Sequence, residues 1–272
     1  MADVDTTKPN IARIYDYWLG GKDNFKADRV AAEAVRQQQP LITELVLENR
    51  QFLTRAVNFV AAQGVRQFVD VGSGLPTSPI RAEDTPPLWL STHEAARAAQ
   101  PGALVAYVDY DPVAVVHSQA LLAHGSDQVV AVQADLRDPA GVLGNQDILQ
   151  AGFDPESPVC VILGCVLHFL QYPEAREVAA GYIESMAPGS YAVVTVGRGD
   201  GDVGQKFENT YNAQNGVGQV YNFTREQVAD LFAGLELEPP GIVPAPDWRP
   251  EGIRPASPKR GAMILAGVGR RL

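Results

Sequence analysis

The sequence predicts a doubly wound α/β fold, in which helices cover both faces of a mostly parallel sheet. Short apolar segments alternate with segments of helical periodicity from residue 67 onward. Some of these segments, such as residues 159–163, are apolar at every position, as strands buried on both faces of a parallel sheet are. The first segment ends in Gly72-Ser73-Gly74, a turn typical of the strand-to-helix connection where such folds bind ligands.

The elements of this fold follow from the periodicity of apolar residues. Strands are expected at residues 67–71, 103–109, 128–133, 158–165, 190–197 and 261–268. Helices are expected near residues 92–100, 112–124, 173–187 and 224–234. Thr224 and Gln227 form a capping-box pattern at the start of the last helix. Residues 197–202 are expected to form a flexible loop, and the Pro-rich segment 239–258 a long surface connection.

The N-terminal part has a different pattern, with three helices in succession. They are expected at residues 11–19, 28–38 and 40–63, where Gly20-Gly21 ends the first and Gly64 ends the third. We therefore expect a single domain over residues 1–272, with a helical extension or lid at 1–63 and a Rossmann-like core at 64–272. Residues 78–91 form an insertion after the glycine turn, expected to be a solvent loop, with a lid as the alternative.

Composition and charge exclude several classes of protein. The chain has 272 residues, of which 46% are hydrophobic and 20% charged, as in globular proteins. A net charge of −10 argues against a nucleic-acid partner. No signal peptide or membrane span is visible. The side chains of Cys160 and Cys165 should point to opposite faces of a strand, which precludes a disulfide and favours a cytoplasmic protein.

The glycine turn indicates the type of cofactor. Gly72 and Gly74 allow a ligand to lie against the backbone, with Ser73 between them and the acid Asp70 before them. Thr77 stands where a dinucleotide fingerprint has its third glycine, which argues against a bound pyrophosphate. An adenosine cofactor without phosphates fits this pattern, and S-adenosylmethionine (SAM) is the commonest. A nicotinamide-dependent oxidoreductase is the weaker alternative.

The ends of the next two strands supply candidates for binding the adenosine. Asp109 is placed to accept hydrogen bonds from both ribose hydroxyls, and Tyr110 follows it at the same edge. The alternative is that Asp109 only terminates its strand. Asp111-Pro112 is typical of a helix N-cap followed by a first-turn proline.

The third strand is followed by Asp135 and Leu136. The Asp135 carboxylate could accept from the adenine amine, while the Leu136 N–H binds a ring nitrogen. The alternative is a turn into the helix at Pro139, which Asp138 satisfies better than Asp135 does.

The fourth strand leads into candidates for the reacting end of the site. Gly164 would allow close approach of the methionine part of SAM. His168 is the best-placed candidate base, since a histidine titrates near neutral pH; a packed or capping histidine is the alternative. The four histidines, His93, His117, His124 and His168, are scattered without ligand spacing, so no metal site is expected.

Several ordered segments carry a resemblance to a known family. They are residues 12–25 with Asp28-Arg29, residues 48–57, 67–77, 92–94, 107–112, 134–139 and 166–169. Together they resemble the actinobacterial SAM-dependent methyltransferases of the DUF574 type, over nearly the whole chain. The resemblance implies a class I methyltransferase fold, with a seven-stranded sheet whose last strand is antiparallel, and SAM as the cofactor.

The resemblance also implies a role for the N-terminal segment. The turn of residues 20–25 would fold over the cofactor as a lid, which makes Tyr17 and Asn24 cofactor contacts. Tyr15, Phe25 and Arg50 become further candidates for the methionine end or the substrate. We therefore expect an enzyme that transfers a methyl group from SAM to a small-molecule acceptor. The alternative is a SAM-binding sensor or regulatory protein without turnover.

Overall fold

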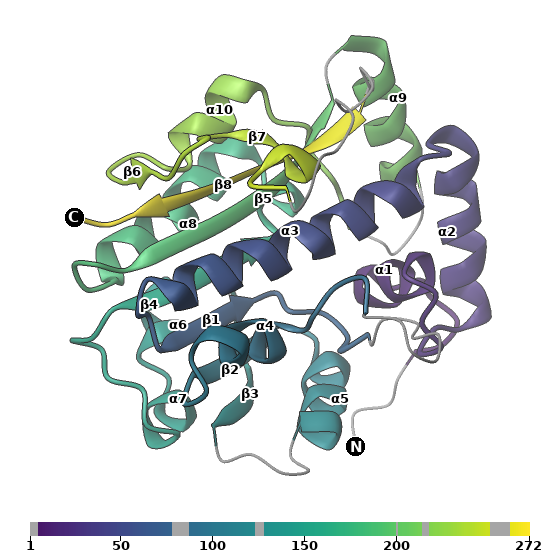
Figure 1. Ribbon diagram of the computed structural model, residues 1–272. Helices are drawn as coiled ribbons and strands as arrows, with labels where there is room; N and C mark the ends of the chain where they lie inside the picture. Colours follow the sequence, from purple (N-terminus) through teal and green to yellow (C-terminus); the bar gives the residue numbers. More distant parts are fainter. Residues whose placement is uncertain (1–4, 78–86, 123–127, 200, 214–217, 251–261) are drawn as a thin grey trace.

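A mixed sheet organises the molecule, as the computed structural model shows for residues 5–77, 87–122, 128–199, 201–213, 218–250 and 262–272. The strand order is β3-β2-β1-β4-β5-β8-β6, and β7 also pairs with β8 (Figure 1). The strands are β1 (Gln67–Val71), β2 (Leu104–Asp109), β3 (Val129–Gln133), β4 (Val159–Gly164), β5 (Tyr191–Gly199), β6 (Glu236–Leu237), β7 (Val243–Pro244) and β8 (Ala262–Arg270). β1 to β5 are parallel and β8 runs antiparallel to β5. The predicted α/β class and antiparallel last strand are confirmed.

Helices cover both faces of this sheet. They are α1 (Ile11–Trp18), α2 (Lys26–Gln38), α3 (Ile42–Ala62), α4 (Thr92–Ala99), α5 (Pro112–Leu122), α6 (Pro139–Leu143), α7 (Gln146–Gln150), α8 (Tyr172–Ser185), α9 (Gly201–Asn212) and α10 (Arg225–Asp230), with short 3₁₀ turns η1 (Leu167–Phe169) and η2 (Ala245–Asp247). In Figure 1, α3 crosses in front of the sheet and α8 lies behind it. The capping box predicted at Thr224 and Gln227 is present at α10. No helix in the described ranges is both long and apolar enough to cross a bilayer.

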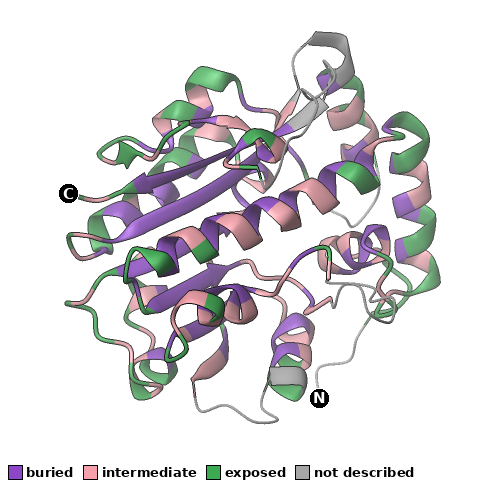
Figure 2. Ribbon diagram, in the orientation of Figure 1, coloured by how far each residue is buried: buried purple, intermediate pink, exposed green. Residues whose placement is uncertain are grey.

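The burial of the strands explains their uniformly apolar sequences. In β4, Val161 and Leu163 pack with α8, whereas Cys160 and Ile162 pack with α3 on the opposite face. Figure 2 shows buried residues along the central strands. Because successive side chains alternate between two covered faces, every position of such a strand is apolar.

The N-terminal segment forms a cap on one end of this core. Ile14 and Trp18 of α1 pack with Val35 of α2 and with Ile42 and Val46 at the start of α3. The rest of α3 packs on the sheet, so this helix joins the cap to the core. Figure 1 shows α1 and α2 together at the end of the sheet where α9 also lies.

Two buried carboxylates hold the cap in shape. Asp28 accepts hydrogen bonds from the backbone N–H groups of Asn10 and Phe25 and from the Arg13 guanidinium, at 2.8–2.9 Å. Asp16 is 1% exposed and accepts from Asp23 and Asn24 in the turn that follows α1. A buried carboxylate is stable only when donors surround it, so these acids fix the path of the turn.

Two expectations about loops need correction. Residues 197–199 belong to β5 and residues 201 and 202 to α9, so these positions are not loop. The described part of the Pro-rich segment is only partly a surface connection, because Pro239, Pro240 and Pro250 are exposed whereas Trp248 is fully buried. Its ring packs edge-on against Phe52 and Phe59 of α3, at centroid distances of 5.5 and 5.6 Å. The insertion at 78–91 lies outside the described residues, except for positions 87–91.

Candidate active site

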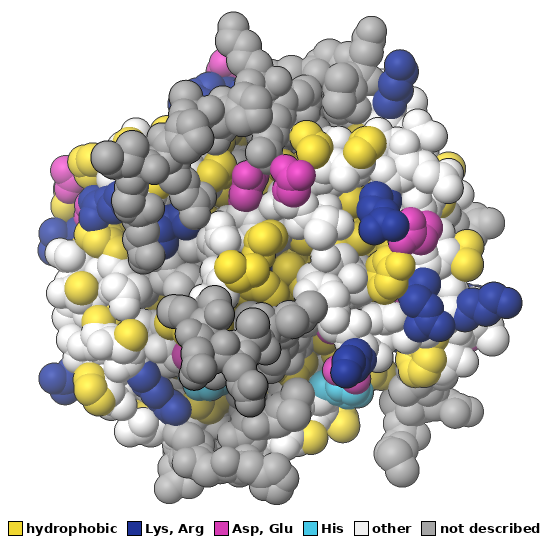
Figure 3. Space-filling model, turned by 45° about the vertical axis from the view of Figure 1, so that its right-hand side comes forward, with side chains coloured by type: hydrophobic (Ala, Val, Ile, Leu, Met, Phe, Trp, Pro, Cys, Tyr) yellow, Lys and Arg dark blue, Asp and Glu magenta, His cyan; other side chains and the backbone are white. Residues whose placement is uncertain are grey.

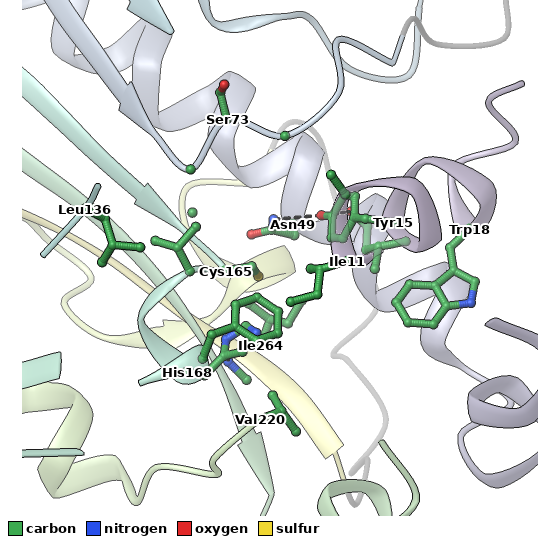
Figure 4. Close-up of a pocket in the computed structure, with 18 of the residues that line it drawn as sticks. Ile11, Tyr15, Trp18, Asn49, Ser73, Leu136, Cys165, His168, Val220 and Ile264 are labelled. Atoms are coloured by element: carbon green, nitrogen blue, oxygen red, sulfur yellow. Dashed lines mark hydrogen bonds between the residues drawn. The ribbon is translucent and has the colours of Figure 1, made fainter. Parts of the chain in front are cut away.

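A cavity opens where the strand order reverses, at the carboxyl ends of β1, β2 and β4. Its volume is about 420 Å³, within the range of small-molecule sites. The glycine turn and the segments after β2, β3 and β4 line one half; α1, α3, η1 and α9 line the other. Figure 4 shows this arrangement, with Ser73 and Leu136 at one end and Trp18 and Val220 at the other.

Backbone geometry requires the glycines of the turn. Gly72 and Gly74 have φ angles of +68° and +67°. A Cβ atom on Gly72 would lie 2.4 Å from Val166 Cγ1, whereas one on Gly74 would meet Ala12 of α1 at 3.9 Å. The turn therefore excludes side chains at both positions, and α1 closes over it.

Thr77 has a function that the sequence did not indicate. Its hydroxyl donates to Asp16 Oδ1 at 2.7 Å, so the cap is bonded directly to the segment after the glycine turn. A glycine here could not make this bond. Asn10 makes a second bridge from the cap, because its amide donates to Asp111 Oδ2 at 2.8 Å.

Asp109 lies in the cavity wall beside the glycine turn. Its Oδ2 accepts from the Gly74 N–H at 2.8 Å and its Oδ1 from the Asp111 N–H at 2.9 Å, and burial raises its pKa. A carboxylate offers about four lone-pair positions, so two remain for a ligand. The expected N-cap is confirmed, because Asp111 Oδ1 accepts from Val113 N–H. Tyr110 lines the cavity from an exposed position.

Asp135 and Leu136 also line the cavity, after β3. The Arg137 guanidinium binds both carboxylate oxygens of Asp135 and lowers its pKa. A ligand amine at Asp135 would therefore share a carboxylate that is already paired. The alternative role of helix cap belongs to Asp138, whose Oδ1 accepts from the Gly141 N–H at the start of α6.

Asp70 and Gly164 stand in the middle of the cavity, at the ends of β1 and β4. Asp70 is 6% exposed; burial raises its pKa, while the Thr92 hydroxyl, 2.6 Å from Oδ2, and the charge of Arg50 lower it. A Cβ on Gly164 would lie 3.1 Å from Leu53 Cδ1, so glycine here makes room for α3 as well as for a ligand.

His168 lines the cavity, but its geometry does not suit a general base. Nδ1 accepts a hydrogen bond from the Gly197 N–H at 3.2 Å, and burial lowers the pKa of the ring to about 4. The neutral ring therefore carries its proton on Nε2 and can only donate there. This geometry places His168 to donate a hydrogen bond from Nε2, which favours the alternative of a packed or capping histidine.

Three N-terminal residues expected at the site lie elsewhere. The Tyr17 hydroxyl donates to Glu33 on α2, and the Asn24 amide donates to Asp16. Phe25 is exposed and stacks under Arg13. None of the three is among the residues that line the cavity, and the hydrogen bonds of Tyr17 and Asn24 lie within the cap. The cover over the cavity is α1, through Ile11, Ala12, Tyr15 and Trp18, and not the turn that follows it.

Asn49 is a site residue that sequence reasoning missed. Tyr15 donates its hydroxyl proton to the Val46 carbonyl, so it accepts from Asn49 Nδ2, at 2.9 Å. This orients Asn49 Oδ1 away from Tyr15 (Figure 4), and the atom is buried in the cavity wall without a hydrogen-bond partner among the described residues. Arg50 Nε is likewise buried without a partner, and the guanidinium lies 5.2 Å from the Tyr15 ring centre. In the sequence, the only sign of this role was that Asn49, a polar residue, stands within the apolar stripe of α3.

The remaining wall is apolar and aromatic. Ring centroids are 4.6 Å apart for His168 and Phe169, 6.3 Å for Phe169 and Tyr211, and 5.9 Å for Phe207 and Tyr211. Ile42, Leu45, Val46, Val220 and Ile264 complete this half. Across the described residues, no group of three or more metal-ligating side chains occurs.

Comparisons with known proteins identify the family. A family model described as S-adenosyl methyltransferase matches residues 1–272. A Thermobifida fusca protein, assigned provisionally as a methyltransferase, is 36% identical, with 98% of this chain and 96% of that chain covered and a TM-score of 0.86. A DUF574 family protein from Streptomyces avermitilis is 31% identical, with 99% and 100% covered and a TM-score of 0.83. No curated protein matches. The chain belongs to the SAM-dependent methyltransferase family, with SAM as its cofactor.

Proposed function

We propose that this chain transfers the methyl group of SAM to a small-molecule acceptor held in the apolar half of the cavity. One observation carries the proposal: a single cavity joins the glycine turn to the aromatic wall. A methyltransferase must align the acceptor with the methyl carbon and exclude water, and a two-part cavity covered on one side by α1 suits both tasks.

The adenosine end of SAM is assigned to the half built by the glycine turn. Gly72, Ser73 and Gly74 would lie against the cofactor, because all three line this half of the cavity. Asp109, with two lone pairs unused, would accept from the ribose hydroxyls. Tyr110, Asp135 and Leu136 border the same region and are assigned to the adenine.

The amino-acid end of SAM is assigned to Asn49 and Arg50. The first offers an unpartnered acceptor and the second an unpartnered donor with a positive charge. The methionine part of SAM carries an ammonium and a carboxylate, which match these two groups. Leaving buried polar atoms unpaired is unfavourable, so a ligand that pairs both gains affinity. Asp70 and Gly164 lie at the same level of the cavity.

A small acceptor agrees with the surface as well as the cavity. The net charge is −10, and on the face shown in Figure 3 basic side chains are scattered among acidic and apolar ones. Such a surface is unfavourable for a nucleic-acid backbone. Cys160 and Cys165 are free thiols, which supports a cytoplasmic location.

Isothermal calorimetry with SAM, S-adenosylhomocysteine and NADH tests the cofactor assignment. We expect micromolar affinity for the first two ligands and no heat with NADH, because the turn lacks the third glycine for a pyrophosphate. Absence of SAM binding would remove both the site assignment and the methyl-transfer proposal.

A further inference from the structure

The two halves of the cavity differ in charge. The carboxylates that line its described part are Asp70, Asp109, Asp111 and Asp135. All four lie at or just after the ends of β1, β2 and β3, around the glycine turn. Within the described residues of α1, α3, η1, α9 and β8, no carboxylate faces the cavity. Among the described residues that line this half, no carboxylate can serve an acceptor as an anionic partner or as a base.

The titratable groups of the acceptor half are also unable to take a proton near neutral pH. Burial raises the pKa of the Tyr15 and Tyr211 hydroxyls and raises that of the Cys165 thiol to about 11. His168 has its only lone pair engaged by Gly197, as described above. Arg50 is assigned above to the carboxylate of SAM, and Arg198 also lines the cavity. The Tyr221 hydroxyl donates to Gln219.

The described part of this half therefore presents apolar surface and hydrogen-bond donors, but no carboxylate. An alkylamine would arrive as an ammonium ion, and burying that charge without an anionic partner is costly. An oxyanion would meet donors instead, and its negative charge would be favoured beside the sulfonium of SAM. The aromatic wall suits a flat ring system.

We propose that the acceptor is an aromatic compound with an acidic hydroxyl, a phenol or enol conjugated to a carbonyl, that binds as its oxyanion and is O-methylated. This inference rests on the proposed function. The hydroxyl proton passes to water before binding. A lone pair of the oxyanion then forms the new O–C bond as the C–S bond breaks, and both electrons of that bond go to sulfur. An anion and a sulfonium thus become a neutral ether and a neutral thioether, with no protein base.

Three probes with the same bicyclic carbon skeleton test the charge preference of the acceptor half without turnover. They are 2-hydroxy-1,4-naphthoquinone, 1-naphthol and 1-naphthylmethylamine, titrated by calorimetry into the protein saturated with S-adenosylhomocysteine. We expect the acidic quinone to bind about 100-fold more tightly than the amine, because only the amine buries an unpaired cation. Equal or tighter binding of the amine, or no binding of any ring, overturns the inference.

A pair of aromatic variants tests the location of the probe. Phe207→Ala removes one ring of the wall and is expected to weaken quinone binding about 10-fold while the affinity for SAM stays unchanged. Phe25→Ala is the matched control, since that ring is exposed and outside the cavity. Quinone affinity unaffected by Phe207→Ala would show that the ring binds elsewhere.

The pH dependence of turnover tests the absence of a protein base. With a series of ring-substituted hydroxyquinones, the apparent pKa in kcat/KM should follow the pKa of each acceptor. An apparent pKa that stays fixed across the series would mean that a protein group takes the proton, and the inference fails. Failure of the proposed function is distinct, because it appears as loss of SAM binding itself.

Discussion

Replacing Arg50 tests the amino-acid end of the cavity. Arg50→Met keeps the unbranched apolar stem and removes the guanidinium, which is half-buried beside Tyr15 with its Nε unpaired. A hydrogen bond to a charged group contributes about 1.5–3 kcal/mol. Loss of a carboxylate contact should therefore weaken SAM binding about 10- to 100-fold.

A second ligand shows whether Arg50 binds the carboxylate of SAM or only supports the cavity wall. Decarboxylated SAM has the sulfonium and ammonium but no carboxylate, so it cannot use Arg50. Removing a neighbouring cation should leave its affinity unchanged or slightly higher. The expected result is thus a large loss for SAM and none for the decarboxylated ligand, both measured by calorimetry at one ionic strength.

Two control variants complete the experiment. Arg36→Met has the same substitution on α2, where the arginine pairs with Glu33 on the surface, and should change neither affinity. Arg50→Lys keeps the positive charge but lacks the planar, bidentate guanidinium, and it should recover part of the lost SAM affinity. Parallel losses for both ligands would refute the reasoning, because Arg50 would then only support the cavity wall. Unchanged affinity for SAM would place its guanidinium outside the cofactor site.

The remaining predictions concern affinity, packing and pH. Asp109→Ala should weaken SAM binding about 10- to 100-fold. The control Asp138→Ala removes a helix cap outside the cavity and should cost about 1 kcal/mol of stability with no change in SAM affinity. Equal SAM affinities of the two variants in calorimetry would contradict the ribose assignment. Gly72→Ala should lower the urea midpoint more than Gly64→Ala, because both residues have positive φ but only the former meets a neighbouring side chain; equal midpoints would show that this contact relaxes. His168 has its pKa lowered to about 4, so its contribution to stability is present above its unfolded value of 6.5 and is lost as pH falls. Relative to His168→Asn, the wild type should lose about 3 kcal/mol between pH 7 and pH 4 in urea unfolding, and identical pH profiles would contradict burial of the neutral ring.

The sheet was predictable because its central strands are buried on two faces and are therefore mostly apolar. The two-residue strands β6 and β7 are too short to carry such a pattern. Helix α9 contains glycines and few apolar residues, and its packing depends on Phe207 and Tyr211, which meet residues distant in sequence. Trp248 was hidden by its proline-rich surroundings, although a tryptophan there needed a partner and finds it on α3.

Within the site, strand ends were predictable and helix faces were not. Gly72, Gly74 and Asp109 lie where parallel strands end, a location fixed by topology alone. Tyr15 and Tyr17 are two residues apart on α1, so they point to nearly opposite sides and only one can face the cavity. Which one does so is decided by tertiary contacts, the bond of Tyr17 to Glu33 and that of Tyr15 to Asn49.

The bond between Thr77 and Asp16 joins the cap to the segment after the glycine turn. Asp16 is almost fully buried on α1, and Thr77 follows the glycine turn, so this contact spans the two sides of the cavity. Thr77→Val keeps the shape but leaves one lone pair of a buried carboxylate unpaired, at a cost of about 1–3 kcal/mol. Because the bond exists only while the cap is closed, its loss destabilises the closed cap relative to an open one. Release of S-adenosylhomocysteine in stopped-flow measurements should therefore be about 10-fold faster or more. Thr224→Val is the matched control, because it removes a helix cap at α10, away from the cavity, and should destabilise folding without changing release. If release from the Thr77 variant were as slow as from wild type, α1 would not be the element that must move for the ligand to leave.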